Sequence, residues 1–155
     1  MTTCHMQRNK LVTVVFALIL AAAMTMPLLA QSGLQLIQPA ELAKVLQGSS
    51  AQKPLIIQVG FRTLYEQAHI PGSEYVGPSS QAEGIQELHK RVQGLPRNRS
   101  IVLYCGCCPW SHCPNVQPAY HELQGMGFRN VKLLYIANNF GADWVDKGYP
   151  VSKDK

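Results

Sequence analysis

Residues 101–115 read IVLYCGCCPWSHCPN, and this stretch decides both the fold class and the chemistry expected of the chain. The run of β-branched and apolar residues at 101–104 is typical of a buried strand. It ends abruptly at Cys105, and a loop with two prolines follows before a helical pattern resumes at Val116. Four of the five cysteines of the chain lie within 105–113. Because loops are seldom buried, four thiols in one loop indicate a site rather than core packing.

The position of Cys105 favours nucleophilic chemistry. A side chain at the end of a strand, followed by a loop and a helix, points into the crevice at the carboxyl edge of an α/β sheet. Unpaired N–H groups of the loop and of the first helical turn stabilise negative charge there. A thiolate in such surroundings is expected to have a lowered pKa and to attack at neutral pH. Cys105 is therefore the predicted catalytic residue.

Residues 1–30 have the pattern of a secretory signal peptide. A basic start precedes an almost wholly apolar run at 11–24, and cleavage is predicted after the small residue Ala30. The alternative is an uncleaved anchor, since residues 11–30 nearly reach membrane-spanning length. We therefore expect a periplasmic or secreted protein, with membrane contact only through 11–30 if this segment is retained.

The charge of the chain excludes one class of partner. The formal net charge is +5, and it falls to +3 without Arg8 and Lys10 of the predicted signal. The basic residues are scattered, with neither a basic stripe nor interleaved aromatic residues, so nucleic acid is not an expected partner. A modest attraction for small anions is all that this charge implies.

Strands and helices are expected to alternate after the signal. The patterns predict strands at 54–59, 73–76, 101–104 and 131–135, and helices at 38–46, 64–68, 81–92, 115–126 and 142–147. Thr63 and Asn115 are the expected N-caps of two of these helices. Such alternation is typical of an α/β domain with three layers, in which helices flank a mainly parallel central sheet.

Several short motifs follow one another within residues 38–152. They are LIIQVG at 55–60, YEQAHIPGS at 65–73, IVLYC at 101–105, GFRNV at 127–131, Trp144 and GYPV at 148–151. In this order and spacing they resemble a single-domain member of the rhodanese-like (sulfurtransferase) family. The resemblance implies a rhodanese-like domain over 38–152, with Cys105 as its active-site cysteine.

The resemblance also implies an activity that needs no cofactor. Cys105 would accept a sulfane sulfur from a small anionic donor, hold it as a persulfide, and pass it to a thiol, which could belong to a protein. Loop amides would cradle the anion as an oxyanion hole does. The residues expected to form this cradle are Gly106, Trp110, Ser111, His112 and Asn115.

Two departures from the family pattern stand out. The family usually carries Asp-Val-Arg after the first long strand, whereas this chain has Gln58, Val59 and Gly60. Arg62 is the nearby residue that could replace the missing charge. The active-site loop is atypical as well, because it is longer than usual and rich in cysteine. The loop sets which anion fits, so the substrate does not follow from the resemblance.

The additional thiols Cys107, Cys108 and Cys113 leave alternatives open. Cys107 or Cys108 could attack a persulfide on Cys105, releasing sulfide and leaving a disulfide. Cys105 and Cys108 also have the CxxC spacing of thiol–disulfide redox proteins, so a redox protein that uses Cys105, Cys107 and Cys108 is the first alternative. The second is a Zn or Cu(I) module, with Cys105, Cys107, Cys108 and Cys113 as soft ligands and His112 as a further candidate.

Overall fold

The computed structural model describes residues 33–48 and 53–153. The predicted signal peptide or anchor at 1–30 lies outside these ranges. Within them, no helix combines the length and the apolar character needed to cross a membrane.

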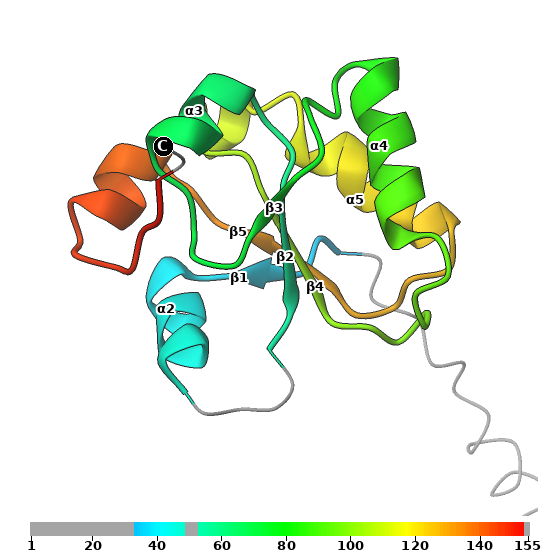
Figure 1. Cartoon of the computed structure of the whole chain (residues 1–155), viewed down its shortest axis with the longest axis horizontal. Helices are drawn as coiled ribbons and strands as arrows, with labels where there is room; N and C mark the ends of the chain where they lie inside the picture. The colour runs from blue at the N-terminus through cyan, green and yellow to red at the C-terminus, as the bar shows by residue number, and fades with distance from the viewer. Residues whose placement is uncertain (1–32, 49–52, 154–155) are drawn as a thin grey trace, which may run out of the picture. The chain divides into compact units, whose positions relative to one another are not determined.

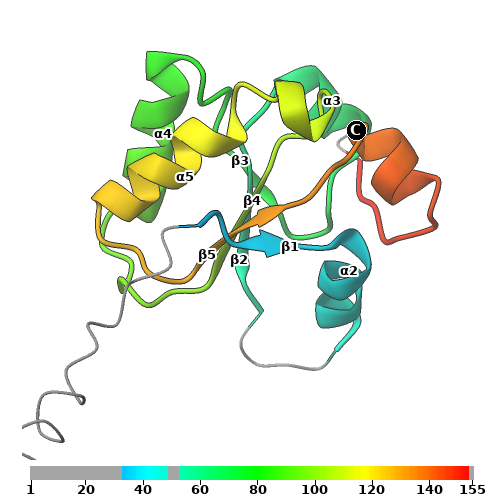
Figure 2. The same ribbon diagram turned by 180° about the vertical axis from the view of Figure 1, so that it is seen from behind.

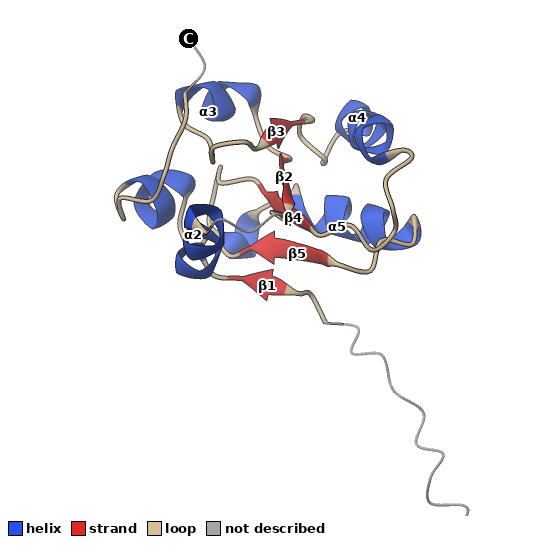
Figure 3. Ribbon diagram, turned by 60° about the horizontal axis from the view of Figure 1, so that its bottom comes forward, coloured by secondary structure: helices blue, strands red, loops and turns tan. Residues whose placement is uncertain are grey.

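Five parallel strands form the central sheet, in the order β1-β5-β4-β2-β3 (Figure 1, Figure 3). The strands are β1 (Leu36–Ile37), β2 (Leu55–Gln58), β3 (Glu74–Tyr75), β4 (Ile101–Tyr104) and β5 (Val131–Leu134). Because every strand runs in the same direction, all their carboxyl ends meet at one edge of the sheet. β4 is the middle strand, so Cys105, the next residue, lies at the centre of that edge.

Helices cover both faces of the sheet (Figure 1, Figure 2). They are α2 (Pro39–Gln47), α3 (Arg62–Gln67), α4 (Ala82–Val92), α5 (Val116–Gly125) and a π-helical segment, Gly141–Val145. In both views α4 and α5 lie on one side of the sheet, and α2 and the π-helical segment lie on the other. The expected three-layer α/β architecture with a parallel sheet is confirmed.

Alternate residues of β2 and β4 face two separate hydrophobic cores. Ile57 and Leu103 pack with the buried side chains of α4 and α5. Ile56 and Val102 pack on the opposite face with α2 and with Trp144, which is fully buried. Burial on both faces explains why these strands read as continuous apolar runs rather than as alternating patterns.

Three details differ from the sequence predictions. β1 was not expected, because a two-residue strand is too short to show a pattern of its own; it pairs with β5. The predicted helix at 142–147 is π-helical, with hydrogen bonds five residues apart such as Asp146 N–H to the Gly141 carbonyl. The predicted cap Thr63 is wrong, since Thr63 lies inside α3 and Phe61 precedes the helix.

Candidate active site

Cys105 follows β4 directly, and its side chain is almost completely enclosed, with 3% of the residue exposed. Its Sγ lies 3.2 Å from Cys107 Sγ and 3.3 Å from Asn115 Nδ2. The sulfur therefore sits between the loop that follows β4 and the residue that precedes α5. The structure thus places the predicted nucleophile at the centre of the carboxyl edge, within reach of an amide donor.

Asn115 is a positioning residue for this sulfur rather than a helix cap. Its side chain makes no capping hydrogen bond to α5, although the residue occupies the N-cap position as predicted. Instead the fully buried amide donates through Nδ2 to Cys105 Sγ, and its Oδ1 accepts the Ser80 N–H at 3.0 Å. Because Oδ1 is engaged in this way, the NH₂ group is directed at the sulfur.

Gln58 and Gly60 support Cys105 from the neighbouring strand. Gln58 Nε2 donates to the Cys105 carbonyl at 3.1 Å, and Gln58 Oε1 accepts the Gly60 N–H at 3.1 Å. A Cβ on Gly60 would lie 2.7 Å from Cys105 Sγ, so only glycine leaves room for the sulfur. In the sequence, Gln58 and Gly60 were noted only as departures from the family pattern. The signals that could have revealed their roles were a polar residue, Gln58, at the end of an apolar strand and a small residue, Gly60, shortly after it.

The other three cysteines of the loop lie close to Cys105, and all four are free thiols. The Sγ atoms of Cys105, Cys107 and Cys113 all lie within 4.8 Å of one another. Cys108 Sγ is 2.9 Å from Cys107 Sγ and 3.6 Å from the His112 carbonyl oxygen. Three of the four predicted thiols thus converge on one point, and Cys108 extends from Cys107.

The negative charge of this cluster rests on Cys113. Hydrogen bonds from the Cys105 thiol, and then from the backbone N–H groups of Asn115 and Val116 at the start of α5, lower the pKa of Cys113 to about 5. The hydrogen bond to Cys113, followed by burial, raises the pKa of Cys105. The lowered pKa predicted for Cys105 is therefore wrong, because the amides at the start of α5 face Cys113.

Cys108 is protonated at neutral pH. Burial, followed by the hydrogen bond with Cys107, raises the pKa of Cys108 to about 12. Since the thiolate is the attacking form, Cys108 is poorly suited to act as a nucleophile at neutral pH.

The residues expected to cradle an anion lie in different surroundings. Gly106 adjoins the site, with a φ of 78° and its carbonyl accepting the Phe140 N–H at 3.0 Å. Ser111 and His112 are exposed, and Ser111 Oγ lies 2.8 Å from His112 Nδ1. Trp110 is half-buried against the α4–α5 core, and its ring centroid lies 5.5 Å from that of Tyr135. Of the five predicted residues, Asn115 is the one whose side chain bonds the Cys105 sulfur.

Two hollows flank the cysteine loop. A cavity of about 10 Å³ is lined by Cys105, Gly106, Cys108, Trp110, Cys113, Val116, Leu134 and Ile136. That volume is about what a single water molecule requires. A much larger open pocket, about 390 Å³, is lined by Leu64, Gln67, Ala68, Gly106, Cys107, Asn139, Phe140, Gly141 and Val145. Cys107 lines the larger hollow, whereas Cys105 lines only the smaller one.

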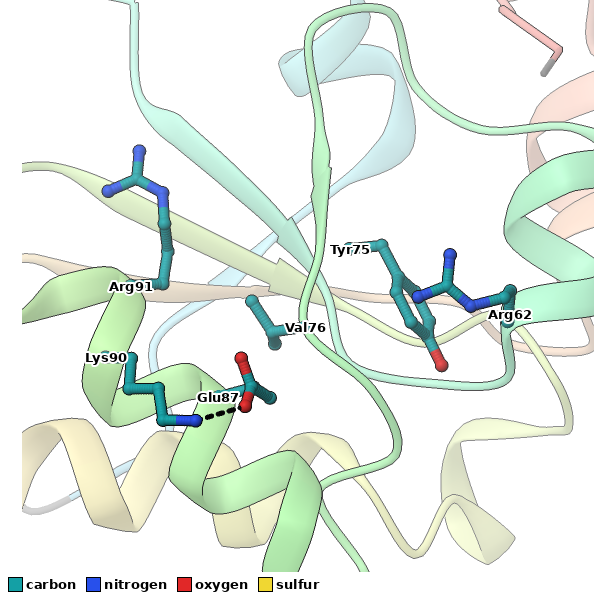
Figure 4. Close-up of a pocket in the computed structure, with 6 residues that line it drawn as sticks. All are labelled: Arg62, Tyr75, Val76, Glu87, Lys90 and Arg91. Carbon is teal, nitrogen blue, oxygen red and sulfur yellow. Dashed lines mark hydrogen bonds and ion pairs between the residues drawn. The ribbon is translucent and has the colours of Figure 1, made fainter.

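Arg62 belongs to a different pocket. Its guanidinium lies 4.4 Å from the centre of the Tyr75 ring and 4.0 Å from a carboxylate oxygen of Glu66. With Lys90 and Arg91 it lines a hollow of about 430 Å³ beside α4, which Figure 4 shows. The side chains of Arg62 and Tyr75 lie against each other in that view, so the guanidinium is already engaged there.

The three sulfur atoms of Cys105, Cys107 and Cys113 can carry out several kinds of chemistry. They can exchange a sulfane sulfur by thiolate attack, or form a disulfide within the loop. They also form a set of soft ligands to which Cu(I) or Zn could bind. The geometry of Cys105, Cys107 and Cys113 is compatible with sulfur exchange, disulfide formation and metal binding. The family to which the fold belongs helps to choose among these three.

Comparison with known proteins identifies that family. The family model described as Rhodanese-like domain matches residues 38–135. Among solved structures, the Alr3790 protein from Anabaena sp. has a TM-score of 0.58 at 23% identity, over 76% of this chain and 92% of that one. No sequence among the curated proteins matches.

Two further structural matches have names that describe an activity. A thiosulfate sulfurtransferase from Pseudomonas aeruginosa has a TM-score of 0.56 at 24% identity, over 79% of this chain and 20% of that one. A single-domain sulfurtransferase from Saccharomyces cerevisiae has a TM-score of 0.55 at 14% identity, over 76% of this chain and 94% of that one. At these identities the matches establish a shared fold.

Proposed function

Since the chain belongs to the rhodanese-like domain family, we propose that it is an exported sulfurtransferase in which Cys105 accepts a sulfane sulfur as a persulfide and passes it to a thiol. Two structural relatives are sulfurtransferases by name, which supports this class of reaction. The signal-like residues 1–30 support a periplasmic or secreted location. The expected partners are a small sulfur-donor anion and a thiol acceptor. The proposal involves neither nucleic acid nor a resident cofactor.

One observation carries the proposal: Cys105 immediately follows the middle strand of the sheet, with an amide donor on its sulfur and a thiolate beside it. The Asn115 amide, 3.3 Å away, stabilises negative charge on Cys105 Sγ when this sulfur attacks the donor and when it leaves the persulfide. The neighbouring Cys113, with a pKa of about 5, is ionised at neutral pH and can receive a proton.

The transfer then follows with atoms and charge in balance. The Cys105 sulfur attacks the outer sulfur of the donor, and the Cys105 proton passes to the Cys113 thiolate. The S–S bond of the donor breaks, so that thiosulfate would leave as sulfite, and the outer sulfur remains on Cys105 as a persulfide anion. An acceptor thiolate next attacks that outer sulfur and leaves with it, and Cys105 recovers its proton from Cys113.

Intact-mass measurement tests this function directly. We expect the protein to gain about 32 Da, the mass of one sulfur atom, when it is incubated with thiosulfate without oxygen. Cyanide should remove the gain and produce thiocyanate. Peptide mapping should place the added sulfur on Cys105, and Cys108→Ser should retain both the mass gain and the turnover. Absence of the mass gain in the unmodified protein would refute the proposal.

Binding of a soft metal is the second candidate, because the Sγ atoms of Cys105, Cys107 and Cys113 lie within 4.8 Å of one another. Thiolates are the ligand type preferred by Cu(I) and suitable for Zn. Cys108 is not part of this mutual group, in contrast to the four-cysteine set considered from the sequence. Native mass spectrometry after addition of Cu(I) or Zn should show one bound ion that Cys113→Ser loses and Cys108→Ser retains. A protein that binds neither metal would exclude this candidate.

A further inference from the structure

The sulfur of Cys105 has almost no access to solvent. The residue is 3% exposed, and the cavity that it lines has a volume of about 10 Å³. Thiosulfate and organic persulfides are larger than the single water molecule that such a volume holds. Donors and acceptors of that size do not fit in this cavity.

Cys107 is placed differently. It is only partly buried, and it lines the open pocket of about 390 Å³. The walls of this pocket come from α3, from the cysteine loop and from the start of the π-helical segment. Its volume is within the range of small-molecule sites in proteins, so a sulfur donor or a thiol fits there.

The two sulfurs are also neighbours. Cys105 Sγ and Cys107 Sγ are 3.2 Å apart. On this basis, and resting on the proposed sulfurtransferase function, we propose that Cys107 is the thiol that exchanges sulfane sulfur with donors and acceptors in solution. Cys105 is then the internal store, which receives sulfur from Cys107 and returns it by the same route.

Each step of this relay is an exchange that needs no oxidant. The Cys107 thiolate attacks the outer sulfur of a donor in the pocket, and the remainder of the donor leaves with the electrons of the broken S–S bond. Cys105 then attacks the same sulfur, its proton passes to Cys113, and Cys107 leaves as a thiolate. The bond between Cys107 and the transferred sulfur breaks as the bond to Cys105 forms, and the reverse steps load an acceptor thiol.

Sodium thiosulfate loading of single variants of the full chain tests the relay. Loading is followed by intact-mass measurement without oxygen. The unmodified chain and Cys108→Ser should both gain about 32 Da, whereas Cys107→Ser should not. Cys108 is the matched control, because it adjoins Cys107 in the loop and is also partly buried, but lines the small cavity instead of the open pocket. Equal loading rates in the unmodified chain and in a folded Cys107→Ser would overturn the relay and leave the proposed function intact. No gain in the unmodified chain would overturn both.

A second variant tests the same route without altering a thiol. Gln67 is exposed at the end of α3 and lines the open pocket, so Gln67→Trp narrows the approach to Cys107. Loading should slow by roughly tenfold, because misplacement of reactants by a small distance has effects of at least this size. Melting followed by circular dichroism establishes that both variants are folded. If Cys107→Ser does not fold, Gln67→Trp decides the question, and an unchanged loading rate in that variant contradicts the relay.

Discussion

The side-chain amide of Asn115 connects the Cys105 sulfur to the backbone that precedes α4. Its Nδ2 is 3.3 Å from Cys105 Sγ, while its Oδ1 accepts the Ser80 N–H at 3.0 Å. The Asn115 side chain is fully buried, so water does not replace either of its hydrogen bonds. One side chain therefore connects the loop, the start of the following helix and the segment before α4 around the Cys105 sulfur.

Asn115→Ala should reduce both stability and sulfur loading. The substitution removes both hydrogen bonds of the fully buried Asn115 amide, which costs about 1–3 kcal/mol in the free energy of unfolding. It also removes the amide donor from Cys105 Sγ, so negative charge on the attacking sulfur is less stabilised and loading from thiosulfate slows. Urea unfolding and intact-mass kinetics measure the two effects. Ser80→Ala is the control, because the bond uses the Ser80 backbone; equal losses in both variants would contradict this role for Asn115.

Gly60→Ala should disturb Cys105 without altering any polar group. The added Cβ would lie 2.7 Å from Cys105 Sγ and 3.0 Å from Gln58 Nε2, so the sulfur has to move. Overpacking of this kind costs about 1–3 kcal/mol, and loading should fall with it. Gly125→Ala is the matched control, because a Cβ there meets nothing within 4 Å. If Gly60→Ala were as stable and as readily loaded as Gly125→Ala, the close approach of Gly60 to Cys105 would matter neither for stability nor for sulfur loading.

The sequence was sufficient to place Cys105 because the relevant signals are local. Residues 101–104 form an uninterrupted apolar run, and the thiol, the loop and the helical pattern follow in order along the chain. A parallel sheet then brings the end of that strand to the same edge as the ends of β2 and β5. The fold and the location of the site follow from these features without any knowledge of side-chain contacts.

The arrangement of charge could not be predicted in this way. Which thiol is ionised depends on which sulfur the N–H groups of Asn115 and Val116 face, and the loop path places Cys113 there. Likewise the Gln58 side chain, on the neighbouring strand β2, donates a hydrogen bond to the Cys105 carbonyl, and these two residues are 47 positions apart in the sequence. Single-sequence patterns carry no information on such contacts, so these roles emerge only from the folded chain.

Gly106→Ala should displace the loop that carries the thiols. Gly106 has a φ of 78°, and a Cβ there would lie 2.6 Å from Phe140 Cβ. Backbone strain alone costs roughly 1–2 kcal/mol, and the clash with Phe140 adds to it. Gly94→Ala has a similar φ of 82° with nothing within 4 Å, so it reports the strain by itself. We expect slower sulfur loading and a lower melting temperature than in Gly94→Ala; indistinguishable behaviour would show that the loop tolerates the contact.

Cys113→Ser should change the pH dependence of sulfur loading. In the unmodified chain the negative charge shared by Cys105 and Cys113 is present above about pH 5 and is lost as the pH falls through that value. Loading should therefore rise with an inflection near pH 5. Without Cys113 the charge must reside on Cys105, where burial opposes it, so the inflection should move upward by at least ~2 pH units.

Initial loading rates from about pH 4 to about pH 9 distinguish this role of Cys113 from a purely structural one. Loss of packing alone would lower the rate at every pH and leave the inflection in place. Cys108→Ser is the control: burial already raises the pKa of that thiol to about 12, so it is protonated across this range and its removal should leave the inflection near pH 5. An inflection that stays near pH 5 in Cys113→Ser would mean that another group carries the charge on which the Cys105 attack depends.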